Sequence, residues 1–277
     1  VIVVERSATG TAADVRAVVG GFDYWAGEAG AQVPAFAALR SPGSALKPFL
    51  FAMAIDRGQA LPDFLVPDVP LEFGSYTPQN FEKDHAVLVR LSDALSRSLN
   101  LPFVHLLNQV GVDRFTALLR TLGVRSLRSE PGYYGLSAAV GAVEVTPLEV
   151  ASLYAALAHD GHPMPLRFLG SEPLPAGRGP AAFSGEAASL TRQVLSRRDR
   201  PDFPDRAKFS GQASGIHWKT GTSFGHRDAW AAGSSDRYTA VVWLGNLDSR
   251  PSSALVGGPA AGPILFDVLE STRSPAA

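Results

Sequence analysis

A serine and a lysine are three positions apart in the stretch Ser44-Ala45-Leu46-Lys47. Positions i and i+3 share one face of a helix, so the Lys47 amine can reach over the Ser44 hydroxyl. A serine hydroxyl becomes an effective nucleophile when a neighbouring base removes its proton, and burial can lower a lysine pKa enough for that role. The pair indicates serine acyl transfer. The alternative is that Ser44 caps a helix and Lys47 is a solvated first-turn residue.

A second candidate stretch, Ser98-Leu99-Asn100, lies at the junction of two expected helices. Its hydroxyl could relay a proton, and its side-chain amide could orient an amide group of a substrate. The alternative is ordinary capping of the second helix by Asn100, because Asn is a preferred N-cap residue.

The third stretch is Lys219-Thr220-Gly221-Thr222-Ser223. On a strand, Lys219, Gly221 and Ser223 would point to one face, and the two threonines to the other. Gly221 would allow a ligand backbone to lie against the strand, and the ammonium and hydroxyl groups would suit a substrate carboxylate. The alternative is an edge strand with a solvated lysine and a threonine-rich turn.

The elements that must position these residues can be placed by periodicity and capping signals. The chain opens on VIVVE, which has the character of a strand cut from a longer protein. Residues 59–90 are expected to be irregular, residues 161–182 to form a loop or loose hairpin, and the polar residues 197–211 to be mobile. Asp236–Arg237 lies at hairpin distance between the last two expected strands. Further strands are expected at 15–25, 216–223, 228–235 and 238–247, and helices at 44–58, 91–98, 101–111, 112–123, 146–161, 185–196 and 262–272. This order predicts an α+β fold. It is an antiparallel sheet flanked by terminal helices, with an inserted all-helical lobe and the active site between them.

Composition excludes several classes of site. Apolar residues make up 45% of the 277 residues and charged residues 18%, which is typical of a globular protein. A formal net charge of −1 argues against nucleic acid as the main partner. The absence of cysteine excludes disulfides, thiolate metal sites and cysteine nucleophiles. Four of the histidines, His85, His105, His159 and His162, show no metal-ligand spacing.

The three stretches occur in the order SxxK, SxN, KTG, a set typical of penicillin-binding proteins and class A β-lactamases. Two of only four lysines fall on these motifs. The segments RSPGSALKPFLFAMAIDRG, RLSDALSRSLNLPFVHLLNQVG and WKTGTSFGHRDAWAAG resemble the transpeptidase domain of class A, bifunctional penicillin-binding proteins. YTPQNF and YTAVVWLGN extend the resemblance, and HWKTGTSFGHRDAWAAG is most similar to the penicillin-binding protein 1C subgroup.

The resemblance implies a role for each motif residue. Ser44 would be acylated by the penultimate D-Ala of a peptidoglycan stem peptide, with Lys47 as the base. Ser98, helped by Lys219, would pass a proton to the leaving amine, and Asn100 would hold the substrate backbone. Thr220 and Thr222 flank Gly221, and Thr222 with Ser223 would contact the terminal carboxylate. The backbone N–H groups of Ser44 and Thr222 would form the oxyanion hole.

The same resemblance implies a context. Residues 1–277 would form a single transpeptidase domain, with a sheet lobe at about 1–40 and 205–277 and a helical lobe at about 41–204. A glycosyltransferase domain and a membrane anchor would lie upstream in the full-length protein, and the domain would face the periplasm or cell surface. Its partners would be stem peptides, with β-lactams as covalent inhibitors.

Other functions use the same motifs. A D,D-carboxypeptidase or a serine β-lactamase gives its acyl-enzyme to water, and acceptor choice depends on groove shape, which motifs do not encode. A β-lactam- or peptide-sensing domain would not turn over, although an intact Lys47 disfavours a silent scaffold. His217, His226 and Asp228 would suit a Ser–His–Asp triad, but Lys47 already fills the role of the base. The aromatic residues Tyr76, Phe81 and Phe224 are candidates for a groove lining.

Overall fold

The computed structural model describes residues 1–21, 23–25, 32–70, 72, 74, 76–130, 132–203 and 215–272. Its main sheet has six strands in the order β5-β2-β1-β8-β7-β6. All neighbours are antiparallel except β2 and β5, which run parallel. The strands are β1 (Ile2–Arg6), β2 (Ala13–Val18), β5 (Leu166–Arg167), β6 (His217–Thr222), β7 (Asp228–Ser234) and β8 (Tyr238–Gly245).

The N-terminal strand pairs with a strand from the C-terminal part of the chain, and Ile2 of β1 is opposite Val241 of β8. Side chains alternate between the faces, as the period of a strand requires. Ile2 and Val4 belong to one hydrophobic cluster, whereas Val3 between them belongs to another. The sheet therefore separates two cores, and both of its faces are covered.

One helix covers each of these faces. The helix α5 (Pro147–Ala158) packs on β8, β1 and β7, and α8 (Gly262–Ser271) packs on β8 and β7 from the face of the second cluster. The C-terminal helix lies where the sequence predicts it, but the other face is covered by α5 from the inserted segment and not by a second terminal helix. Thr146 begins α5 with a capping box to Glu149.

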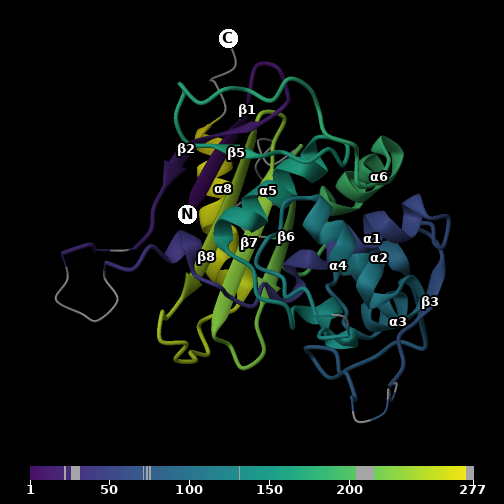
Figure 1. The fold of residues 1–277 in the computed structure, drawn as a ribbon. Coiled ribbons are helices and arrows are strands. Elements are labelled where there is room, and N and C mark those ends of the chain that lie inside the picture. Colours follow the sequence, from purple (N-terminus) through teal and green to yellow (C-terminus); the bar gives the residue numbers. More distant parts are fainter. Residues whose placement is uncertain are drawn as a thin grey trace.

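Most of the remaining helices gather beside the β6 edge of the sheet (Figure 1). The helix α1 is apolar all round and buried along nearly its whole length, as the sequence predicts. A small antiparallel sheet of two short strands lies within residues 59–90, which the sequence predicts to be irregular. These elements are α1 (Lys47–Asp56), α2 (Leu91–Ser96), α3 (Leu101–Val110), α4 (Val112–Thr121), α6 (Gly185–Leu195), β3 (Leu65–Pro67) and β4 (Leu88–Arg90).

The α+β architecture and the helical insertion are thus confirmed. Two differences from the prediction concern β2 and β5. The expected strand at 15–25 ends at Val18, before Gly20, and β5 adds a parallel pair inside the segment 161–182, which was expected to form a loop or loose hairpin. Part of the polar segment expected at 197–211 lies outside the described residues, from 204 onward.

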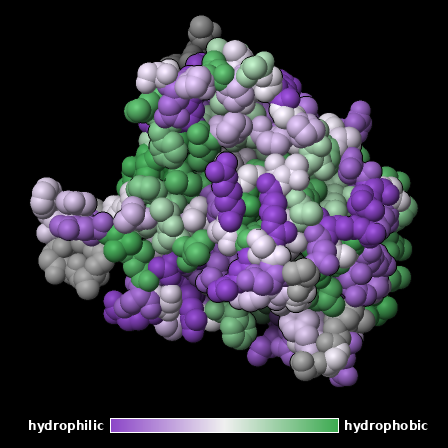
Figure 2. Space-filling model, viewed as in Figure 1, coloured by the Kyte–Doolittle hydropathy of each residue, from purple (hydrophilic) through white to green (hydrophobic). Residues whose placement is uncertain are grey.

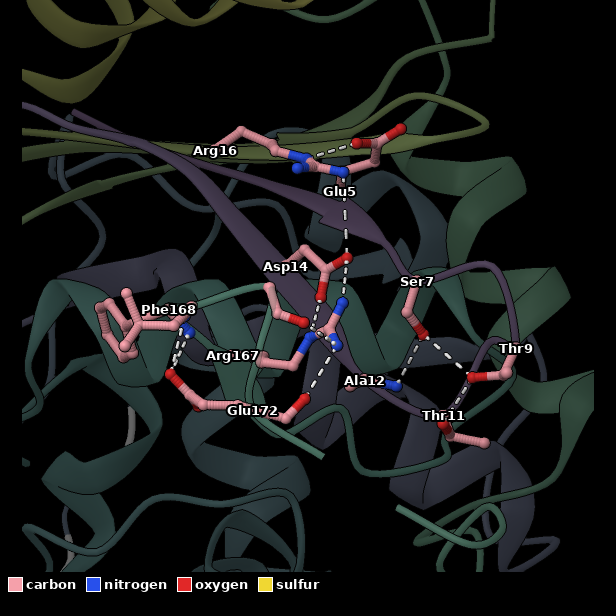
Figure 3. A network of polar contacts seen from close by, with 12 residues as sticks. Glu5, Ser7, Thr9, Thr11, Ala12, Asp14, Arg16, Arg167, Phe168 and Glu172 are labelled. Atoms are coloured by element: carbon pink, nitrogen blue, oxygen red, sulfur yellow. Dashed lines mark hydrogen bonds and ion pairs between the residues drawn. The ribbon is translucent and has the colours of Figure 1, made fainter. Parts of the chain in front are cut away.

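Charged residues fix the outer edge of the sheet, far from β6 in strand order (Figure 3). Arg167 on β5 binds Asp14 on β2 through two hydrogen bonds of 2.6 and 2.9 Å. Arg16 on β2 binds the buried Glu5 on β1 at 2.5 Å. These pairs link three successive strands and hold the short parallel strand in register.

The face drawn in Figure 2 interleaves hydrophilic and hydrophobic side chains. Within the described ranges, every helix is too short or too polar to cross a membrane.

Candidate active site

Ser44 lies in a single 3-10 turn, Gly43–Leu46, that leads directly into α1. The backbone N–H of Lys47 donates to the Ser44 carbonyl, and Pro48 occupies the first turn of α1, where a missing N–H costs nothing. The Ser44 side chain is half-buried. Among the described residues, no hydrogen bond holds its hydroxyl, which is therefore free to rotate towards a base or a substrate.

The turn that carries Ser44 is pressed against β6. Gly43 has φ +53, and a Cβ on it would lie 2.3 Å from the Thr222 carbonyl oxygen and 2.8 Å from the Thr222 nitrogen. A Cβ on Gly221 would lie 2.1 Å from the Pro42 carbonyl oxygen. Both glycines are required because two backbones approach closely. Gly221 therefore meets the chain's own backbone, whereas the sequence suggested an approaching ligand.

Lys47 is fully buried inside a cage of three oxygens. Its Nζ donates to the carbonyls of Ser98 and Leu99, both at 2.8 Å, and to Oδ1 of Asn100 at 2.7 Å. Burial is the main reason that the Lys47 pKa falls well below its ordinary value, and the charge of Lys219 lowers it further. This environment contradicts a solvated first-turn lysine.

Ser98 joins the two lysines. It has φ +60, which is uncommon for a residue with a Cβ and marks a backbone held by its surroundings. In this conformation its carbonyl accepts from Lys47, while its Oγ accepts from Lys219 Nζ at 2.8 Å. Ser98, a single strained residue between α2 and α3, thus contacts both Lys47 and Lys219.

Asn100 precedes α3 but does not cap it with its side chain. Its Oδ1 accepts from Lys47, and its Nδ2 donates to the carbonyl of Gln79 at 2.8 Å. The simple capping alternative is wrong, because the amide is used across the site.

A second asparagine, Asn80, lies outside the three motifs and supports Asn100 from behind. Asn80 Oδ1 accepts from the backbone N–H groups of Asn100 at 2.8 Å and Leu101 at 3.2 Å. Its Nδ2 donates to the buried carboxylate of Asp68 at 2.8 Å. The stretch YTPQNF that contains Asn80 was part of the resemblance, but no local spacing connects it to Asn100.

Lys219 lies on β6, the edge strand, and is also fully buried. Its Nζ donates to Ser98 Oγ at 2.8 Å and to the Thr220 carbonyl at 2.9 Å. Burial lowers its pKa to about 7, the carboxylate of Asp202 raises it, and the guanidinium of Arg200 lowers it. The motif lysine is therefore not a solvated edge residue.

Each of the three hydroxyl groups that follow Lys219 takes part in a hydrogen bond. Thr220 Oγ1 donates to Asp202 Oδ2 at 2.7 Å. Thr222 Oγ1 accepts from Gly257 N at 3.0 Å, and Ser223 Oγ accepts from Asp228 N at 2.8 Å. A hydroxyl has one proton to donate. Thr220 has used its own on Asp202, whereas Thr222 and Ser223 only accept in the hydrogen bonds of the described residues.

The structure does not assemble the alternative triad. Asp228 accepts from Trp243 Nε1 at 2.9 Å, and the buried His217 has no described hydrogen-bond partner for its Nε2. His226 instead packs against the ring of Phe81, with centroids 5.7 Å apart. Phe224 is fully exposed, while Tyr76 packs against the main core. Among the described residues, no cluster of three or more His, Asp or Glu side chains could hold a metal ion.

The chain was compared with known proteins. The family model described as "Penicillin binding protein transpeptidase domain" matches residues 25–244. Penicillin-binding protein 1C of Escherichia coli is 37% identical over 230 residues, which are 83% of this chain and 29% of that protein. Penicillin-binding protein 1A of Neisseria meningitidis is 29% identical over 92% of this chain and 34% of that protein.

The fold agrees with the sequence comparison. The crystal structure of penicillin-binding protein 1A from Haemophilus influenzae superposes with a TM-score of 0.78, at 21% identity, over all of this chain and 48% of that one. The chain spans about a third of the length of the curated relatives named here. It belongs to the penicillin-binding protein transpeptidase family, as a transpeptidase domain of the class A type.

Proposed function

We propose that this domain crosslinks peptidoglycan stem peptides by serine acyl transfer. The observation that carries the proposal is the meeting of the three motifs, since Lys47 and Lys219 both contact the Ser98-Leu99-Asn100 turn at 2.7–2.8 Å beside the Ser44 turn. Nucleophile, base, proton relay and cation are thus brought together from segments far apart in the chain.

In the first half-reaction, Ser44 Oγ attacks the carbonyl of the penultimate D-Ala and gives its proton to Lys47. A neutral lysine has two N–H groups and a lone pair, so one of its three oxygen partners must be released. The lowered pKa of Lys47 supports this neutral form. The C–N bond then breaks, and the terminal D-Ala amine leaves with a proton delivered through Ser98.

In the second half-reaction, an amine from another stem peptide attacks the ester on Ser44. Lys47, neutral again after the first half-reaction, takes the proton of the attacking amine and gives it to Ser44 Oγ as the ester C–O bond breaks. An amide forms, and the Ser44 hydroxyl is regenerated. The oxyanion is stabilised by the backbone N–H groups of Ser44 and Thr222, and the close approach of Gly43 to Thr222 supports that pairing. Before acylation, Lys219 and the hydroxyl protons of Thr222 and Ser223 bind the carboxylate of the terminal D-Ala, and Asn100 orients the peptide backbone.

The proposal extends to the full-length protein. It would carry a glycosyltransferase domain and a membrane anchor upstream, and this domain would work on the extracytoplasmic side. β-Lactams would acylate Ser44 in place of the stem peptide, and no metal or organic cofactor is required for these steps.

Incubation with a labelled penicillin tests the proposal directly. Intact mass should show one adduct, and Ser44→Ala should show none. A stem peptide ending in D-Ala–D-Ala, with and without an acceptor amine, then separates the products. Crosslinked product supports the proposal. Hydrolysis of the peptide without crosslinking would indicate a carboxypeptidase. Rapid release of hydrolysed penicillin would indicate a β-lactamase. A stable adduct without peptide turnover would indicate a sensing domain.

A further inference from the structure

An ion pair lies behind β6, outside the three motifs. Arg200 binds Asp202 through two parallel hydrogen bonds, Nε to Oδ1 at 2.7 Å and Nη2 to Oδ2 at 2.9 Å. The Arg200 side chain is fully buried, and its guanidinium carbon lies 4.0 Å from the centroid of the Trp218 ring. Its Nη1 also donates to the Trp218 carbonyl at 2.8 Å. The pair is therefore built onto the strand immediately before Lys219.

Asp202 also holds the strand immediately after Lys219. Its Oδ2 accepts from Thr220 Oγ1 at 2.7 Å as well as from Arg200. Strand residues 218 and 220 are thus both tied to the same ion pair, one through the carbonyl and one through the hydroxyl. The arrangement uses the donor proton of Thr220, which is why this threonine cannot donate to a substrate carboxylate.

The charged groups behind Lys219 have opposite signs. Arg200 behind the strand is a cation, and its charge opposes a positive charge on Lys219. Asp202 is the carboxylate that favours it. Although burial raises the pKa of Asp202, Arg200 and Lys219 hold that pKa below its ordinary value, so Asp202 is ionised.

We propose that Asp202 is a positioning residue for acyl transfer, fixing Thr220 and supplying the negative charge that keeps Lys219 an ammonium group able to donate to Ser98. Arg200 holds the Asp202 carboxylate in place. The inference rests on the proposed function for its catalytic consequence, but its electrostatic part can be measured without any reaction.

Asp202→Asn separates this role from simple fold stabilisation, because the amide keeps the shape and one acceptor oxygen while removing the charge. The chain has four lysines, so lysine labelled with ¹³C at Cε gives a readable NMR spectrum in which Lys219→Arg identifies the signal. In wild type, Lys219 should titrate near pH 7. In Asp202→Asn, the midpoint should fall by on the order of one pH unit, as expected for losing a nearby opposite charge.

The rate of penicillin acylation should follow the same shift. Acylation should decline at high pH as Lys219 loses its proton, and this alkaline limb should move down in Asp202→Asn. Well above the midpoint, a shift of one pH unit means an approximately tenfold lower rate. Asp199→Asn is the matched control, since Asp199 is an exposed partner of Arg197 in the same segment and should move neither readout.

Removing one partner of a buried ion pair can unfold a protein, because the other charge remains uncompensated. The double variant Arg200→Gln with Asp202→Asn strands no charge. Its Lys219 midpoint should also fall, but less, because the effect of Asp202 on Lys219 exceeds that of Arg200.

An unchanged Lys219 titration in the folded single variant overturns the inference. If the single variant does not fold, an unchanged Lys219 titration in the double variant overturns the inference. Absence of a penicillin adduct on wild type would contradict the proposed function instead, and the NMR titration would still decide the role of Asp202.

Discussion

Lys47 and Lys219 occupy opposite walls of one site, and the protein surrounds each of them differently. Lys47, at the start of α1, is held by two backbone carbonyls and an amide oxygen, all of them uncharged. Lys219, on β6, has a hydroxyl and a carbonyl at its amine and an ionised carboxylate nearby. Both side chains are fully buried.

The difference teaches how one fold can contain two lysines with opposite tasks. Burial disfavours the charged form of both, and neutral acceptors compensate only part of that cost. Lys47 therefore has the surroundings of a base. The carboxylate of Asp202 gives Lys219 what Lys47 lacks, so Lys219 has the surroundings of a cation. The two lysines should therefore respond differently to the same substitution.

Replacing Lys47 should have the largest effect. Lys47→Met removes the base, and Lys47→Arg keeps a charge that does not leave at working pH. Both should lower the penicillin acylation rate by about 10²–10⁴-fold, the usual contribution of a general base. Stopped-flow kinetics measure the acylation rate, and thermal unfolding confirms that each variant is folded. Lys83→Asn, at an exposed position, is the control. An arginine variant retaining a tenth of the wild-type rate would break the contrast.

Replacing Lys219 should show whether the reaction uses its positive charge or its ability to act as a base. Lys219→Met should lower acylation by about 10²–10³-fold, as for loss of one electrostatic donor. Lys219→Arg keeps the charge and should lose only on the order of tenfold. The same acylation assay applies. Equal losses in the two variants would show that the charge of Lys219 is not what the reaction uses.

Replacing Asn80, which holds the backbone next to the Lys47 cage, should have a smaller effect. Asn80→Ala leaves two backbone N–H groups, those of Asn100 and Leu101, without their acceptor. Urea unfolding should show a loss of about 1–3 kcal/mol, and the cage around Lys47 should loosen. Asn246→Ala, which removes one exposed hydrogen bond, should change stability by less than about 0.5 kcal/mol. Equal stability of the two variants would count against this support.

His217 offers the smallest test, on the same strand as Lys219 but with no carboxylate raising its pKa. Burial lowers the His217 pKa from 6.5 to about 3, and nearby Arg192 and His159 add to this. The unfolded state therefore binds more protons below pH 6.5, so stability is full above that pH and declines as pH falls towards 3.

Urea unfolding at pH 7.5 and 5.5 measures this decline. His217 should account for about 1 kcal/mol of it, so His217→Gln should reduce the difference between the two pH values by that amount. His85→Gln, at an exposed position, controls for the loss of an imidazole. An unchanged pH difference in His217→Gln would mean that burial does not suppress charge on this strand as proposed.

Much of the fold could be predicted locally. Periodicity and punctuating residues place α5 and α6 within three residues of their observed ends, and the hairpin at Asp236–Arg237 joins β7 and β8 as expected. The predictions were weaker where neighbours decide the outcome. Gly20 marks the approach of the Phe36 ring beyond the end of β2, and Asn100 has the type of a cap but serves Lys47 instead.

The sequence by itself determined the three motifs, their order and the elements that carry them, because these depend on residue types at short spacing. Only the tertiary structure decided which groups surround each lysine. Ser98 is 51 residues from Lys47 and 121 from Lys219, and Thr222 meets Gly43 through the backbone alone. Burial and charge at such contacts set a pKa, and neither exists until distant segments pack together.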